Sequence, residues 1–249
     1  MIAYDFETTR IEAGTPRPLY ITAYSEQLGV QLESPIKNMD HLHDLLVKHL
    51  LRDDLTGIKF VAWNANNFDA YFIAAALVTD PAYTLRPYLT QSNALRGLRI
   101  NKTEDLQADG TFPKNAITWE FLDGIAMLGM VGVPLSKFLA SFTPDFEKLT
   151  GVIDFEKETF DAKNPQHRAY ALRDSVGLYH AMNKAQDILI QNFNQALTVT
   201  MGGACIKIFA ANIPAGKTVN TLNMQENKTV RQFAMRGGFC YCVKSYMGP

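Results

Sequence analysis

The sequence predicts an α/β fold in which helices pack on a mixed β-sheet. Apolar runs of the kind that form strands alternate along the chain with longer segments of helical apolar spacing. The chain has 249 residues, 47% of them hydrophobic, which is enough for a large core. Interleaved strands and helices of this kind are typical of layered α/β domains.

Short apolar runs predict the strands. Residues 2–8 (IAYDFET) form the first run, and residues 19–27 and 29–34 form two more that join near Gly29. The remaining predicted strands are residues 59–63, 94–102 and 117–124.

Four segments carry helix signals. Residues 38–52 space their leucines along one helix face. The asparagines of NANN, residues 64–67, favour a turn or a cap before a helix over residues 68–78. Pro134 suits the start of a short helix over residues 134–142, and residues 165–193 form the longest predicted helix.

The sequence also bears on the cellular compartment. The longest uninterrupted apolar run, Ala70 to Val78, is far shorter than the roughly 20 residues that span a bilayer. The N-terminus lacks the basic and apolar regions of a secretory signal. The three cysteines cannot form a closed set of disulfides and show no zinc-site spacing. We therefore expect a cytoplasmic protein with no membrane partner.

Charge is unevenly distributed. Residues 1–200 carry 18 basic and 24 acidic side chains, whereas residues 201–249 carry six basic side chains and only one acidic, Glu226. A basic end indicates contact with nucleic acid, although a solvated basic surface explains it equally well. Glycine and proline also become frequent from about Leu197, so we predict that a second, shorter unit starts there.

Two carboxylates stand one residue apart in the first predicted strand. Because residues i and i+2 of a strand point to the same face, Asp5 and Glu7 would lie side by side, with Phe6 on the other face. Like charges this close repel, and they persist only if they share a proton or a cation neutralises them. The pair makes a metal site possible, although such pairs also arise by chance in a chain with 25 acidic residues.

Two further acids occupy positions suited to chemistry. Asp69 follows a predicted strand and a turn, and α/β active sites gather their groups at the carboxyl ends of strands. As an acid in a first helical turn it would equally well stabilise the helix dipole. Tyr170 and Asp174 lie four residues apart on a predicted helix and share a face, a spacing that is also common among surface pairs.

In combination, these elements resemble three exonuclease motifs. Asp-x-Glu in the first strand, Asn-x3-Phe-Asp at residues 64–69 and Tyr-x3-Asp at residues 170–174 are similar to those of DEDD-type 3′→5′ exonucleases. More narrowly, they resemble the proofreading domain of family B DNA polymerases, especially the protein-primed polymerases of phages and linear plasmids. The resemblance implies a ribonuclease H-like mixed sheet flanked by helices and, for a viral protein, a location in the host cytoplasm.

The end of the chain resembles the beginning of a polymerase domain or a connector to it. RQFAMRGGF, residues 231–239, is similar to the Tyr-x-Gly-Gly element that touches single-stranded template in that family, with Met235 in place of the tyrosine. We therefore assign residues 1–190 to an exonuclease domain and residues 191–249 to an incomplete polymerase segment or connector. The motifs for nucleotide addition are missing from these 249 residues, so we expect no polymerase activity.

The resemblance also implies roles for individual residues. Asp5, Glu7, Asp69 and Asp174 would act in catalysis as the ligands of two divalent ions, Mg²⁺ or Mn²⁺, and an all-oxygen ligand set suits Mg²⁺. Tyr170 would orient the attacking water, because a phenol with a pKa near 10 is a poor base at neutral pH. The family carries a lysine element that helps to hold the primer end, and either Lys148 or Thr150 occupies the corresponding position in this sequence. The candidate DNA-binding residues are Thr8, Asn64, Phe68, Lys148, Arg236, Gly237 and Gly238.

The sequence thus predicts a metal-dependent 3′→5′ exonuclease that trims single-stranded or frayed DNA 3′ ends, as the proofreading part of a protein-primed DNA polymerase. The expected partners are a single-stranded DNA 3′ end, the missing polymerase part and a terminal protein. Two alternatives stay open. The same acids would serve a 3′→5′ RNA exonuclease, and a non-catalytic module would use its basic end to bind single-stranded DNA or a terminal protein.

Overall fold

The computed structural model describes residues 1–9, 16–89, 95–149, 151–153, 158–214, 217 and 225. Contacts between residues divide the chain into two units, Met1–Ile208 and Phe209–Pro249. Nearly all of the described residues belong to the first unit, and the fold described below is that of this unit. The predicted division at residue 190 stays a prediction.

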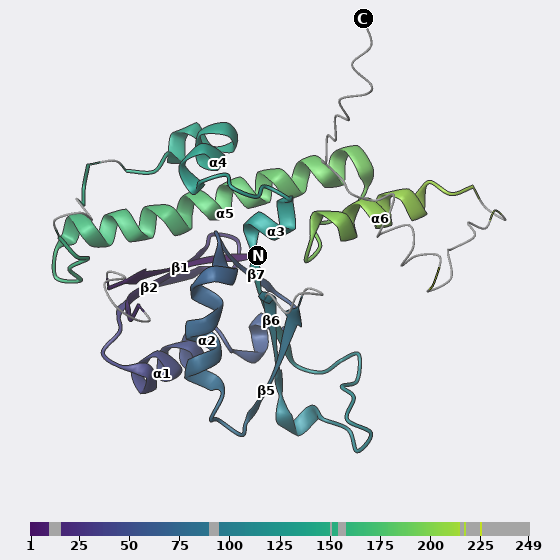
Figure 1. Cartoon of the computed structure of the whole chain (residues 1–249), viewed down its shortest axis with the longest axis horizontal. Helices are drawn as coiled ribbons and strands as arrows, with labels where there is room; N and C mark the ends of the chain where they lie inside the picture. The colour runs from purple at the N-terminus through teal and green to yellow at the C-terminus, as the bar shows by residue number, and fades with distance from the viewer. Residues whose placement is uncertain are drawn as a thin grey trace, which may run out of the picture. The chain divides into compact units, whose positions relative to one another are not determined.

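In the described part of the chain, a mixed sheet of seven strands lies at the centre of the first unit (Figure 1). The strand order is β3-β2-β1-β4-β7-β6-β5. The pairs β1–β4 and β4–β7 are parallel, and the other neighbouring pairs are antiparallel. The strands are β1 (Ile2–Thr8), β2 (Pro18–Ser25), β3 (Val30–Pro35), β4 (Lys59–Ala62), β5 (Tyr83–Leu89), β6 (Leu95–Lys102) and β7 (Thr118–Asp123).

Helices cover both faces of the sheet. The α-helices are α1 (Met39–His49), α2 (Asp69–Leu77), α3 (Gly124–Leu128), α4 (Leu135–Phe142), α5 (Pro165–Phe193) and α6 (Met201–Ala211). Short 3₁₀ turns are η1 (Asp53–Leu55), η2 (Ala65–Asn67), η3 (Thr103–Asp105) and η4 (Pro144–Phe146). In Figure 1, α1 and α2 lie on one side of the sheet and α5 on the other. None of the helices in the described ranges combines the length and apolar character that crossing a bilayer requires.

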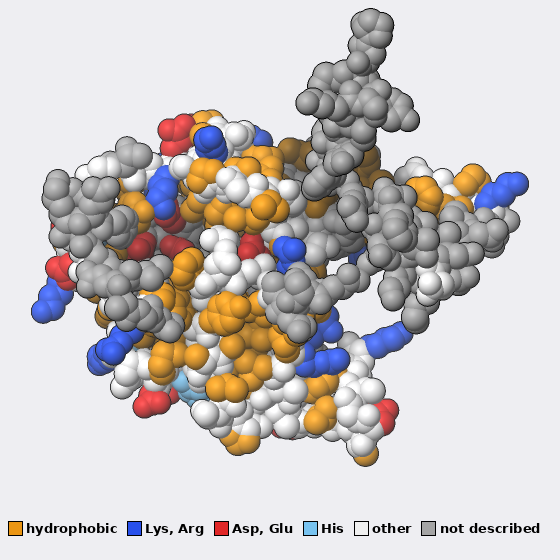
Figure 2. All heavy atoms as spheres, viewed as in Figure 1, with side chains coloured by type: hydrophobic (Ala, Val, Ile, Leu, Met, Phe, Trp, Pro, Cys, Tyr) orange, Lys and Arg blue, Asp and Glu red, His pale blue; other side chains and the backbone are white. Residues whose placement is uncertain are grey.

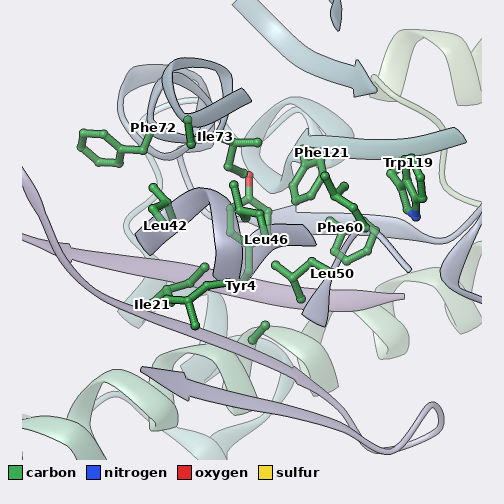
Figure 3. Packing of buried hydrophobic residues seen from close by; sticks show 14 of the residues in the cluster. Tyr4, Ile21, Leu42, Leu46, Leu50, Phe60, Phe72, Ile73, Trp119 and Phe121 are labelled. Atoms are coloured by element: carbon green, nitrogen blue, oxygen red, sulfur yellow. The ribbon is translucent and has the colours of Figure 1, made fainter. Parts of the chain in front are cut away.

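One core fills the space between the sheet and the helices α1 and α2 (Figure 3). Its centre is a group of fully buried rings, in which Phe60 stacks on Phe121 with ring centroids 4.5 Å apart. Tyr4 meets Phe121 edge to face at 5.5 Å. Leu42 and Leu46 of α1 pack against the same layer, which confirms the leucine face predicted for that helix.

A second core joins the opposite face of the sheet to α3, α4 and α5. Ala3, Val61 and Leu122 contribute from the sheet, and Phe138 and Met182 from the helices. Tyr4 lies in the first core and Ala3 in the second, as the alternation of side chains along a strand requires. This alternation decides which residues of β1 face α5.

The predicted α/β fold is confirmed, as a mixed sheet with helices on both faces. The predicted helix 165–193 matches α5 exactly. Asn38 caps α1, where its side chain accepts a hydrogen bond from the His41 N–H at 2.8 Å. The predicted helix over residues 134–142 is found as α4, but it begins at Leu135, and Pro134 is its N-cap residue instead of its first residue.

Three of the strands and α-helices were not predicted. β5 was missed because Arg86 and Pro87 interrupt its apolar pattern, and a proline is tolerated there because β5 is an edge strand. The short helix α3 was read as the end of a strand, since Asp123 ends β7 and caps α3. α6 was missed because Gly202 and Gly203 stand in its first turn and glycine disfavours helix.

We predict that Phe121→Ala lowers the free energy of unfolding by about 3–5 kcal/mol, because it leaves a cavity between Phe60 and Tyr4. Urea denaturation followed by circular dichroism measures the change. Val131→Ala is the control, because Val131 is 82% exposed and its loss should cost less than about 0.5 kcal/mol. Equal unfolding midpoints for the two variants would contradict this view of the core.

Candidate active site

Asp5 and Glu7 lie on the face of β1 that α5 covers. Their neighbours Tyr4 and Phe6 belong to the core on the opposite face, and Ala3 belongs to the core that contains α5. β1 contacts α5 directly. The structure therefore turns both carboxylates toward the same helix.

Hydrogen bonds between β2 and α5 set the position of the helix along the sheet. Thr22 of β2 is the direct cross-strand neighbour of Asp5. The Thr22 hydroxyl lies 2.7 Å from the Ser175 hydroxyl and donates to the Ala171 carbonyl at 3.4 Å. Asp174 immediately precedes Ser175 on the helix, so these bonds bring Asp174 beside Asp5.

Tyr170 and Asp174 occupy successive turns of α5 and are both buried. The Asp174 Oδ2 atom accepts a hydrogen bond from the Lys148 ammonium at 2.5 Å. Its Oδ1 atom is buried and has no hydrogen-bond partner among the described residues. A buried acceptor of this kind is costly to leave unsatisfied, so it marks a place where a cation or a donor fits.

The segment that carries Lys148 is held tightly against α5. Arg173 donates to two backbone carbonyls of this segment, at 2.6 Å and 3.4 Å. The Phe146 ring stacks on His180 with centroids 4.3 Å apart. Gly177 permits the approach, because a Cβ there would stand only 3.0 Å from the Phe146 carbonyl oxygen. The position of Lys148 is thus built into the packing.

Lys148 contacts two of the candidate catalytic residues, Asp174 and Tyr170. Its ammonium lies 2.5 Å from Asp174 and 4.8 Å from the centroid of the Tyr170 ring. Burial lowers the pKa of Lys148, but Asp174 and Tyr170 outweigh it and the net shift is upward. Lys148 therefore carries a positive charge among the carboxylates. Thr150, the alternative candidate, lies outside the described residues.

Asp69 reaches the site from the start of α2. Its side chain is 6% exposed, and its carboxylate accepts a hydrogen bond from the backbone N–H of Phe6 in β1. Phe68, the preceding residue, is exposed. Asn64 takes the left-handed conformation with φ 65°, which asparagine tolerates. Its side-chain Oδ1 atom accepts a hydrogen bond from the Asn67 side-chain amide at 2.6 Å.

The pKa values show that the four acids influence one another. Burial, followed by Glu7, Asp69 and Asp174, raises the pKa of Asp5 well above its usual range. Burial, Asp174 and Asp69 raise the pKa of Glu7 to about 7. Burial is also the main cause that raises the pKa of Asp69 to about 7 and that of Asp174 above its usual range. β1, α2 and α5 thus bring together the four acids that the sequence singled out.

Tyr170 stays protonated at neutral pH. Burial is the largest cause that raises its pKa to about 12, and Asp174 acts in the same direction against Lys148. The phenol is therefore available as a hydrogen-bond donor and not as a base.

The acidic site is compatible with a metal ion but is not a preformed cage. Across the described ranges, no three carboxylate, imidazole or thiol side chains stand close enough together to hold an ion. The donors are nevertheless all oxygens, burial and then neighbouring carboxylates raise the pKa values of Asp5 and Glu7, and one buried oxygen of Asp174 has no partner among the described residues. These features suit a hard divalent cation. Figure 2 shows Asp and Glu side chains recessed between the part of the molecule that carries α5 and the part that carries β1 and β2.

Other predicted residues lie at the margin or beyond the described chain. Thr8 ends β1 after an irregularity in its pairing with β2, and it is partly exposed. Arg236, Gly237 and Gly238 lie outside the described residues. Their predicted DNA contacts stay predictions.

Asp123 was missed by the sequence reasoning. It is 3% exposed, and its carboxylate accepts hydrogen bonds from the backbone N–H groups of Asn66, Ile125 and Ala126. It thereby ties the turn before Asp69 to the start of α3, and its charge helps to raise the pKa of Asp69. The signal that pointed to Asp69 was an acid near the carboxyl end of an apolar strand. The same signal is present at residues 121–124 (FLDG), where Asp123 is the acid.

Solved structures of a DNA polymerase are among those that share this fold. Phi29 DNA polymerase complexed with primer-template DNA and incoming nucleotide substrates has a TM-score of 0.64 and 19% identity, over 98% of this chain and 40% of that chain. Phi29 DNA polymerase complexed with single-stranded DNA has a TM-score of 0.61 and 20% identity, over 98% of this chain and 41% of that chain. This chain thus spans about 40% of the length of that polymerase, and the likeness is one of fold. No protein-family model and no curated protein matches the chain.

We predict that the metal-free protein becomes more stable as the pH falls from 8 to 6. Glu7 and Asp69 have pKa values of about 7 in the folded protein, above their values in the unfolded chain. Such groups stabilise the fold when protonated, and this stability is lost as the pH rises through the folded pKa. Thermal unfolding in EDTA at both pH values measures it.

Glu7→Gln tests the cause of this pH dependence. The variant should unfold at a higher temperature than the wild type at pH 8 in EDTA and should depend less on pH. Glu104→Gln, in an exposed position, is the control and should leave the pH dependence unchanged. A wild-type protein whose stability rises with pH over this range would refute the electrostatic description.

Proposed function

We propose that the protein is a metal-dependent 3′→5′ exonuclease that removes nucleotides from single-stranded or frayed DNA ends. The observation that supports this proposal is the convergence of Asp5, Glu7, Asp69 and Asp174. Burial raises the pKa of each, and neighbouring carboxylates of the group raise those of Asp5 and Glu7 further. Groups perturbed in this way are candidates for a functional site. The fold likeness to a DNA polymerase solved with single-stranded DNA supports DNA as the substrate.

In this proposal the four carboxylates would hold two Mg²⁺ or Mn²⁺ ions. Such ions, when bound, lower the pKa of a water and stabilise the charge that develops on a phosphodiester during hydrolysis. The carboxylates supply the hard oxygen ligands, and the unsatisfied Oδ1 atom of Asp174 supplies a free acceptor.

Tyr170 and Lys148 position the other groups. Tyr170 is protonated at neutral pH and would donate a hydrogen bond to the attacking water or to a phosphate oxygen. Lys148 offsets the charge of Asp174 and would offer a cation to the phosphate. Both roles use contacts that α5 already fixes.

Phe68 and Asn64 would hold the terminal nucleotides at the entrance to the site. Phe68 is exposed directly beside buried Asp69, so a base can stack on it. An end that is mismatched costs less to unpair, which favours frayed ends over matched duplex. The sequence resemblance favours a proofreading role, with a polymerase part and a terminal protein as the proposed partners.

The proposed activity predicts that the purified chain shortens 5′-labelled single-stranded DNA from its 3′ end in Mg²⁺ and not in EDTA. A matched duplex should be degraded much more slowly. The Asp5→Ala/Glu7→Ala variant should lose activity by orders of magnitude, because it removes two ligands. A gel time course measures all three.

Two controls make this result specific. Asp44→Asn alters an exposed carboxylate on α1 and should retain full activity. Circular dichroism must show that the double variant is folded. An intact oligonucleotide in every lane, with all proteins folded, would refute the exonuclease, and faster degradation of RNA than of DNA would move the proposal to an RNA substrate.

We also predict that Phe68→Ala weakens binding of single-stranded DNA by about 1–3 kcal/mol, because a stacked base loses its aromatic partner. Fluorescence anisotropy in EDTA measures it. Phe193→Ala is the matched control, since it removes an exposed ring at the far end of α5. An equal loss in both variants would mean that Phe68 has no particular contact with DNA.

A further inference from the structure

A cavity lies at the end of the sheet opposite the acidic site. It measures about 560 Å³ and is lined by β5, β6, the start of β7 and residues 112–116. Thr118 begins β7 and Gly57 precedes β4, so this cavity lies at the amino ends of those parallel strands. The acidic site lies at the opposite edge, where Asp123 ends β7 and Asp69 begins α2 after the turn that follows β4. The cavity is therefore a separate site.

The alternation of side chains makes this part of the sheet polar on one face. Leu98, Ile100 and Trp119 point into the core. The residues between them point to the other face, which here lines the cavity and belongs to none of the cores that the described residues form. Those lining the cavity from the strands are Arg86, Arg99, Asn101, Thr118 and Glu120.

Positive charge is in excess in this cavity. Arg86 and Arg99 are direct cross-strand neighbours, and like charges in that position repel. Glu120 lies opposite Arg99 and pairs with it at 2.7 Å. Arg86 has no carboxylate partner among the described residues, and Lys114 adds a further exposed cation. An anion placed between Arg86 and Lys114 would relieve this repulsion.

The cavity also offers an aromatic face and a hydrogen-bond acceptor. The Arg86 guanidinium lies 5.6 Å from the centroid of the partly exposed Phe112 ring. Asn101 is 2% exposed, and its amide group donates to Thr118 Oγ1 at 2.6 Å. The Asn101 Oδ1 atom is buried without a partner in the described part of the chain. A ligand that donates an N–H group would satisfy it.

We propose that this cavity binds one nucleotide, with its phosphate at Arg86 and Lys114, its base against Phe112 and a base N–H group directed to Asn101. The volume falls within the roughly 300–1,000 Å³ of small-molecule sites. A free nucleoside monophosphate and a unit of single-stranded DNA offer this same chemistry. The proposal does not depend on the exonuclease proposal.

Isothermal titration of the full chain with dAMP in EDTA tests the proposal. We expect saturable binding that Arg86→Ala and Phe112→Leu each weaken about tenfold, because a charged hydrogen bond and a stacking face are lost. Arg86→Gln keeps most of the side-chain length and should weaken binding as well. Lys48→Ala removes one exposed charge from α1 and is the control that should bind normally.

Further measurements distinguish a free nucleotide from a DNA strand as the ligand, and distinguish this cavity from the acidic site. Tighter binding of a single-stranded tetranucleotide than of dAMP indicates a strand, and equal or weaker binding indicates a free nucleotide. Arg86→Ala should retain any hydrolysis of DNA, and Asp5→Ala/Glu7→Ala should retain dAMP binding. Absence of saturable binding at millimolar dAMP, binding unchanged in Arg86→Ala and Phe112→Leu, or equal affinity for inorganic phosphate would each overturn the proposal.

Discussion

The crowding of four carboxylates, two buried and two partly buried, is the constraint on which the rest of this structure depends. Burial raises the pKa of Asp5, Glu7, Asp69 and Asp174, and the neighbouring carboxylates add to this shift at Asp5 and Glu7. Such a cluster opposes folding at neutral pH unless a cation compensates it. Lys148 supplies part of that compensation, because its ammonium lies against Asp174. The remaining negative charge is what gives the site its affinity for a further cation in the proposed function.

Two cores hold the carboxylates in place against that repulsion. The stacked rings around Phe121 fix the sheet from one side, and α5 packs on the other. The hydrogen bond between the Thr22 and Ser175 hydroxyls fixes the position of α5 relative to β1, the strand that carries Asp5. The packing of the cores and the geometry of the acidic site therefore depend on each other. Gly177 then lets the segment with Lys148 approach the helix closely. Packing therefore decides the electrostatics of the site.

The same sheet presents opposite charge at its two ends. The carboxyl ends of the parallel strands gather acids, whereas the amino ends, together with β5 and β6, present Arg86, Arg99 and Lys114. A cation suits the first end and an anion suits the second. A nucleic-acid strand bears phosphates along its whole length, so a protein with both features can contact it through cations and through metal-bound phosphates. The separation of the two sites allows each to be tested without the other.

Local patterns in the sequence determined the fold class, the helix α5 and the shared faces of Asp5 with Glu7 and of Tyr170 with Asp174, because strand and helix periodicity are properties of neighbouring residues. β5 escaped detection because Pro87 breaks such a pattern, and only pairing with β6 makes it a strand. The tertiary structure alone decided which faces meet. It brought Lys148 to a carboxylate 26 residues away and placed two cationic strands side by side. Long-range pairing of this kind depends on the packing of the whole chain, which no local pattern encodes.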